Sequence, residues 1–136
     1  MLQAGLALAV LASAPATRGQ QIPSGLPHVV FIAAASAKTI AGRVDAFRTG
    51  LKDLGHVEGR TILVDYLYGE EKLDLIPALV ADAMRRKPDV LVSAGPSVTR
   101  ALRAATSTVP IVMAFDPDPV GAGFVGLISL FNIFGR

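Results

Sequence analysis

The most constraining feature of this chain is residues 50–69, GLKDLGHVEGRTILVDYLYG, where a helix passes almost directly into a strand. The helical part continues a regular apolar stripe, and Gly55 can take the left-handed conformation that ends a helix. After a short polar loop, residues 61–68 are rich in the branched and aromatic side chains typical of a β-strand. The same joint recurs at residues 85–92 and 104–113. We therefore predict alternating strands and helices in a layered α/β fold.

The apolar pattern predicts four strands joined by three helices. The strands are expected at residues 29–35, 61–68, 89–93 and 111–115. The first helix should follow Ser36 as its cap and bury a stripe that runs from Ile40 to Leu54. The second should be capped by Asp74, with Pro77 in its first turn, where a missing N–H is tolerated. The third should begin at Pro96.

This order of elements indicates where a ligand would bind. Right-handed crossovers between four parallel strands give a flavodoxin-like sheet with helices on both faces. If the strand order is 2-1-3-4, the chain reverses direction between strands one and three, and ligands bind beyond the carboxyl ends of the strands there. The loop at Ser36 then lies beside residues 93–97, SAGPS, with Asp116 at the next strand end. Ser36 and Ser97 each open a helix, where backbone N–H groups and hydroxyls can hold an anion such as a carboxylate.

Composition excludes several classes of protein. Hydrophobic residues make up 51% and charged residues 18% of the chain, which excludes a disordered polymer. The net charge is only +2, and no interleaving of aromatic and basic residues indicates a nucleic-acid partner. The sequence has no cysteine, no cluster with metal-ligand spacing and no G-x-S-x-G elbow. We therefore predict neither an enzyme nor a bound metal or cofactor.

Other motifs favour structural roles. Residues 121–126, GAGFVG, match G-x-G-x-x-G, but a proline-broken loop precedes them in place of a strand, so a dinucleotide site is not predicted. His28 and His56 are assigned to a linker and a loop on the surface. Asp116 and Asp118 alternate with prolines, which favours a rigid turn over acid–base catalysis.

The N-terminal segment differs from the rest of the chain. Residues 6–14 form an apolar run too short to span a bilayer, and small-x-small cleavage patterns lie at its end. This predicts a secretory signal peptide over residues 1–19 and a linker over residues 20–27. No Lys or Arg precedes the run, so a frayed apolar helix or a misassigned start codon remains the alternative.

Three segments together resemble a known family: GLKDLGHVEGRTILVDYLYGE, then RRKPDVLVSAGPSVTRALRAATSTVPIVMA, then DPDPVGAGFV. They resemble the ABC-transporter substrate-binding proteins, a family that includes tryptophan- and other aromatic-amino-acid-binding members. The resemblance covers residues 28–128. It implies the first lobe of a type 1 periplasmic-binding-protein clamshell, which closes on a small solute and docks on a membrane permease. It implies no catalysis and no cofactor.

The resemblance also implies which residues contact the solute. In this family the contacts of the first lobe come from the loops after strands one, three and four. In this sequence the corresponding residues are Ser36, then Gly95, Pro96 and Ser97, then Asp116. They coincide with the edge that the topology indicates. The expected function is therefore that of a periplasmic solute-binding component of an ABC importer, with an amino-acid-like solute.

The end of the chain departs from the family. Residues 129–136 do not resemble the continuation into a second lobe, so we expect a truncated and impaired copy. The alternative is a free-standing flavodoxin-like interaction module that self-associates through its uncovered apolar surface and has no transport role. A small α/β enzyme is a third hypothesis, disfavoured because the sequence shows no nucleophile–base pair or metal set.

Overall fold

The computed structural model describes residues 25–123 of the chain. The elements in chain order are β1 (His28–Ala33), α1 (Ala41–Asp53), β2 (Leu63–Tyr68), the 3-10 turn η1 (Leu73–Leu75), α2 (Ile76–Arg85), β3 (Val90–Ala94), α3 (Pro96–Ala105) and β4 (Ile111–Phe115). All of the predicted strands and helices are present, and β4 has the predicted bounds. Within the described range, no helix has both the length and the apolarity needed to cross a membrane.

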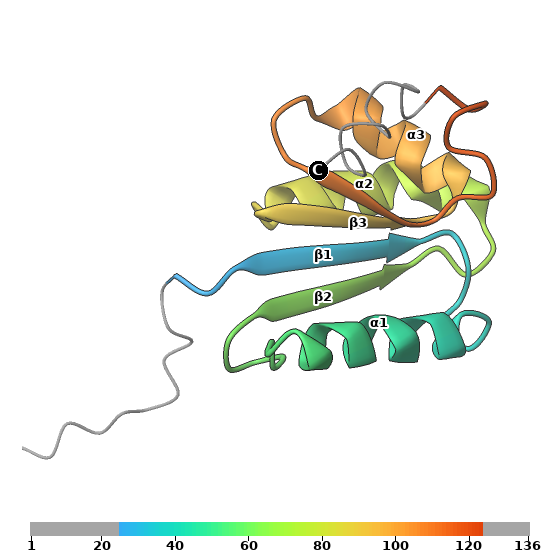
Figure 1. Ribbon diagram of the computed structural model, residues 1–136. Coiled ribbons are helices and arrows are strands. Elements are labelled where there is room, and N and C mark those ends of the chain that lie inside the picture. Colours follow the sequence, from blue (N-terminus) through green and yellow to red (C-terminus); the bar gives the residue numbers. More distant parts are fainter. Residues whose placement is uncertain (1–24, 124–136) are drawn as a thin grey trace, which may run out of the picture.

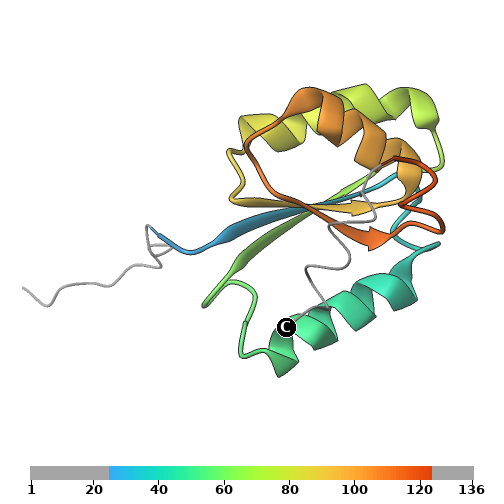
Figure 2. The same ribbon diagram turned by 45° about the horizontal axis from the view of Figure 1, so that its top comes forward.

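The four strands form one parallel sheet in the order β2-β1-β3-β4, as predicted (Figure 1). Helix α1 covers one face of the sheet, and α2 and α3 cover the other (Figure 2). The connection from β1 therefore leaves toward one face and the connection from β3 toward the other. Their carboxyl ends meet at one edge of the sheet, which is the predicted switch point.

Strand β1 builds the core because it is buried on both faces. Val29, Phe31 and Ala33 point toward α1, whereas Val30 and Ile32 point toward α2 and α3. This alternation follows from the two-residue period of a strand. The Phe31 ring also lies 5.3 Å from the ring of Phe47 and 5.7 Å from that of Tyr66, measured between centroids. Loss of such a ring typically destabilises a fold by about 3–5 kcal/mol.

The cover over the sheet is uneven at β4. Ile111 packs against the cluster under α2 and α3, so this side of the strand is covered. On the α1 side, Val112 and Phe115 keep 52% and 41% of their surface exposed. Among residues 25–123, only β3 pairs with β4, which makes β4 an edge strand of this part of the chain. The described residues therefore leave an apolar strip of the sheet open between α1 and β4.

Two helix starts and one helix end differ from the sequence prediction. Ser36 caps a preceding turn, and the N-cap of α1 is Ile40, without a side-chain hydrogen bond. Asp74 lies inside η1, and α2 starts after Leu75. At the end of α1, Gly55 has φ 85° and donates to Lys52 O at 2.9 Å, as expected of a left-handed cap. Leu54 therefore lies past the last turn and is 78% exposed, so its predicted burial was wrong.

Candidate functional site

The amino end of α3 is the best-defined feature of the carboxyl edge. Gly95 precedes the helix with φ 114° and ψ 151°, a backbone conformation that essentially only glycine adopts. Pro96 follows as the first helical residue, where its missing N–H removes no hydrogen bond. No side chain of the described residues caps this helix, so first-turn N–H groups near the half-buried Ser97 have no side-chain acceptor there. This end of α3 can hold an anion.

A buried hydroxyl pair fixes that helix end to the sheet. The hydroxyls of Ser93 and Thr99 lie 2.8 Å apart, and both residues are fully buried. The Thr99 hydroxyl and the Thr99 N–H each donate to Gly95 O at 3.1 Å. Sequence reasoning missed Thr99, although a threonine four residues after Gly95 is placed to bond its carbonyl. The pair makes the start of α3 rigid, which favours binding without reorganisation.

Asp116 lies beside this helix start. The Gly95 N–H donates to Phe115 O at 2.9 Å, which brings the residue after Phe115 next to the cap of α3. Asp116 Oδ1 accepts the Asp118 N–H at 3.0 Å. The other oxygen, Oδ2, is buried and has no hydrogen-bond partner among the residues that the structure describes. Such a carboxylate oxygen is unfavourable unless a donor reaches it.

Ser36, the predicted contact after β1, already has an anionic partner within the protein. Its N–H donates to Glu71 Oε1 at 3.0 Å, and the Thr39 hydroxyl donates to the same oxygen at 2.6 Å. The Ser36 hydroxyl lies 2.9 Å from the Thr39 hydroxyl. The Thr39 hydroxyl and the Ser36 N–H both hold the pKa of Glu71 below its usual value. The Ser36 N–H is therefore occupied. The Ser36 hydroxyl accepts the Thr39 N–H and donates its proton to the Thr39 hydroxyl, so it keeps only the capacity to accept one more hydrogen bond.

Glu71 reaches Ser36 because of an unusual turn after β2. At Gly69, a Cβ would come within 2.8 Å of Ala34 O, so the two backbones approach as closely as only glycine allows. Glu70 and Glu71 then both have positive φ, 51° and 60°. The Glu71 N–H donates to Ala34 O at 2.9 Å. No local pattern in the sequence marks these two glutamates as left-handed.

The family described as ABC transporter substrate binding protein matches residues 29–134. This chain belongs to that family. The match extends past residue 128, at which we expect the first lobe to end. The boundary at residue 128 therefore stays a prediction. No curated protein matches the sequence.

Solved structures agree with this substrate-binding family in fold. A conserved domain protein from Vibrio cholerae is 28% identical with a TM-score of 0.68. An ABC domain in complex with L-Trp from Streptococcus pneumonia is 19% identical, with a TM-score of 0.68. A ligand-free, open substrate-binding protein with adhesive properties from Clostridium difficile is 19% identical, with a TM-score of 0.67. In each comparison 74% of this chain covers 34% of the other, so the chain spans about a third of their length.

The turn after β4 completes the carboxyl edge of the sheet. Asp118 Oδ1 accepts the Gly121 N–H at 2.8 Å, which confirms the rigid turn predicted for the proline-rich segment. Gly123 O accepts a hydrogen bond from Arg103 at 2.7 Å. The last three residues of the G-x-G-x-x-G match, 124–126, lie outside the described residues. Among residues 25–123, no group of three potential metal-ligating side chains occurs.

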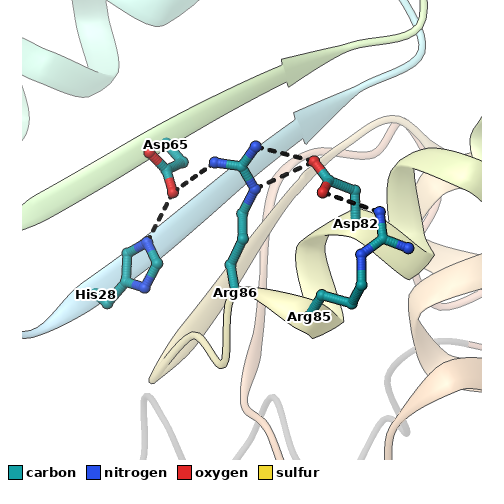
Figure 3. A network of polar contacts seen from close by, with 5 residues as sticks. All are labelled: His28, Asp65, Asp82, Arg85 and Arg86. Atoms are coloured by element: carbon teal, nitrogen blue, oxygen red, sulfur yellow. Dashed lines mark hydrogen bonds and ion pairs between the residues drawn. The ribbon is translucent and has the colours of Figure 1, made fainter.

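Charged residues also gather at the opposite, amino edge of the sheet (Figure 3). Asp65 Oδ2 lies 2.9 Å from both His28 Nε2 and Arg86 Nη1. Arg86 also bonds Asp82, which in turn pairs with Arg85 (Figure 3). Burial raises the pKa of Asp65, but the hydrogen bonds from Arg86 and His28 outweigh it and hold that pKa below its usual value. The network ties β1, β2 and the end of α2 together.

His28 was predicted to be a surface residue of the linker, and that prediction was wrong. It is the first residue of β1, and only 19% of its side chain is exposed. Its imidazole is bonded to Asp65, which lies 37 positions further along the chain. The physical reason is the parallel pairing of β1 with β2, which aligns His28 with Leu63 and brings Asp65 close. This histidine is structural and lies far from the carboxyl edge.

Proposed function

We propose that this chain supplies the first lobe of a periplasmic solute-binding protein that serves an ABC importer. The proposed solute is a small zwitterion of the amino-acid class. Membership of the substrate-binding family supports the transport role. The proposed partner is the importer's membrane permease. We propose no catalytic role for the chain.

One observation carries the choice of solute. Asp116 directly follows Phe115, whose carbonyl accepts the N–H of Gly95 at the start of α3, and its Oδ2 has no partner among the described residues. A negative group and a positive helix end therefore lie on neighbouring segments. An α-amino acid carries an ammonium and a carboxylate on adjacent atoms. The ammonium would donate to Asp116, and the carboxylate would accept from the first turn of α3. Each charged hydrogen bond contributes about 1.5–3 kcal/mol.

The other predicted contacts have graded roles in this proposal. Gly95 and Pro96 set the direction of α3 and leave its first N–H groups open. The Ser97 hydroxyl adds a donor at the same helix end. Ser36 contributes through its hydroxyl alone, because Glu71 occupies its N–H. We therefore propose Asp116 and the α3 terminus as the principal contacts, and Ser36 as a secondary one.

Solute affinity should depend on a second lobe. Small-molecule sites bury most of their ligand, and an open edge of one sheet leaves much of it in water. The solved structures in which this fold recurs are about three times as long as the part that this chain matches. We propose that residues 28–128 bind an amino acid weakly on their own. Secretion by a leader over residues 1–19, a linker over 20–27 and a tail over 129–136 complete the proposed organisation.

The sharpest test uses a two-lobed family member that carries residues 28–128 of this chain as its first lobe. Calorimetric titration with a panel of amino acids identifies the solute for the unsubstituted protein. Asp116→Asn should then lower affinity about tenfold or more, because it weakens the bond to the ammonium. Asp118→Asn is the matched control, since its side chain caps a turn and can still accept the Gly121 N–H. Equal affinity of the two variants would reject the proposed contact.

A second candidate function is self-association through the open strip beside β4. Val112 and Phe115 are the exposed large apolar residues there, and the outer edge of β4 pairs with no strand in the described range. Exposed apolar area next to an open strand edge favours association. Sedimentation velocity should show species larger than a monomer, and Val112→Glu should shift them to monomer. A monomer at all concentrations would exclude this function.

A further inference from the structure

Arg43 differs from the other charged residues of its neighbourhood. Arg48, five residues later on α1, has carboxylate partners in Asp45 and Glu58. Arg43 has no ion pair or hydrogen bond among the described residues. Its guanidinium carbon instead lies 3.9 Å from the centroid of the Phe115 ring. The contact joins the first turns of α1 to the end of β4 and leaves the charge without an anion.

A pocket of about 370 Å³ opens beside this contact, on the α1 side of the sheet. Phe31 and Phe47 line its inner wall, and Val112 and Phe115 line the wall formed by β4. Arg43 is the single charged residue among those that line it within the described range. The volume lies within the range of small-molecule sites. The pocket therefore combines an apolar, aromatic interior with one positive charge at its rim.

We propose that this pocket is a binding site for a small aromatic monocarboxylate, separate from the proposed amino-acid site. The ring would lie among the phenylalanines, which favour offset or edge contacts with another aromatic group. The carboxylate would pair with Arg43, whose planar guanidinium matches it with two parallel hydrogen bonds. No acidic residue lines the pocket in the described range, so an ammonium has no partner there. This distinguishes the ligand from an amino acid.

The test uses the full chain and 4-phenylbutyrate as the probe, with neutral 4-phenylbutanamide of the same shape beside it. Titration is followed by the chemical shifts of the protein's methyl groups. We expect the acid to bind about tenfold or more tightly than the amide, because only the acid forms the charged pair. Arg43→Gln should remove that preference. Lys52→Gln, which makes the same charge change on the exposed side of α1, should retain it.

A second variant fills the pocket without changing charge. Ala46 also lines it and faces solvent, so Ala46→Leu should weaken both probes while the helix stays intact. Asp116→Asn should leave the binding of 4-phenylbutyrate unchanged, so failure of the amino-acid proposal would not affect this one. Equal binding of acid and amide, or an undiminished preference in Arg43→Gln, would overturn the proposal. Absence of binding to the unsubstituted chain would also overturn it, the result expected if a second copy of the chain covers the pocket.

Discussion

The two edges of the sheet both carry charged residues but use them differently. At the amino edge, His28, Asp65 and Arg86 are joined in one network, and each carboxylate has a partner. At the carboxyl edge, Asp116 Oδ2 has no partner in the described range, and the start of α3 has no side-chain cap. A network in which every polar group has a hydrogen-bond partner stabilises a fold. Polar groups without partners at a preorganised edge can instead bond a ligand. We therefore assign a structural role to the amino edge and propose that the carboxyl edge binds the solute.

The largest expected effect tests whether the carboxyl edge is preorganised. Gly95→Ala places a side chain at φ 114° and ψ 151°, which should destabilise the fold by about 1–3 kcal/mol. Chemical denaturation measures this. Gly50→Ala is the matched control, because Gly50 lies inside α1 with open space around it. That control should be neutral or stabilise by up to about 1 kcal/mol. If both variants behave alike, the strained start of α3 is not a constraint.

A smaller effect tests the amino edge. Asp65→Asn removes the carboxylate that accepts from His28 and Arg86 and should destabilise by about 1 kcal/mol after allowance for solvent screening. Asp45→Asn is the control, because Asp45 is exposed and its contact to Arg48 spans 3.9 Å. Thermal unfolding distinguishes the two. If Asp65→Asn is as stable as the unsubstituted chain, the network contributes nothing to the stability of the fold.

Features that depend on neighbouring residues could be predicted from the sequence, whereas contacts between residues far apart in the chain could not. Strand and helix positions came from local apolar periods and from Gly55 and Pro96, which act on their immediate neighbours. The strand order followed because crossover handedness leaves few alternatives. The bond from Ser36 to Glu71 joins residues 35 positions apart and requires a left-handed glutamate, so no local pattern indicates it.

The same limit applies to the other features that sequence reasoning missed. Asp65 reads as a polar residue within a strand, and only the parallel pairing of β1 with β2 brings it to His28. The open pocket at Arg43 depends on how far α1 extends over the sheet, which periodicity does not specify. Polar networks and uncovered faces are properties of packing between elements. They become visible only when the elements are assembled.

The smallest effect concerns pH and again compares the edges. The pKa of Asp65 lies below its unfolded value, so the ionised carboxylate stabilises the fold above that unfolded pKa. The contribution is lost as the pH falls below about 4 and through the folded pKa. Unfolding measured from pH 6 to pH 2 should therefore show a shallower loss of stability in Asp65→Asn than in the unsubstituted chain. If the two proteins lose stability in parallel as the pH falls, Asp65 does not contribute to the loss of stability in acid.

The most direct test of this assignment compares the direction in which two substitutions change the free energy of unfolding. Asp65→Asn breaks a satisfied network and should lower the free energy of unfolding. Asp116→Asn replaces a buried, unpartnered charge by a neutral group and should raise it by up to about 1 kcal/mol. Equilibrium denaturation of both variants without solute gives both values. Opposite signs are the predicted result, and destabilisation by Asp116→Asn equal to that of Asp65→Asn would contradict the assignment of binding to the carboxyl edge.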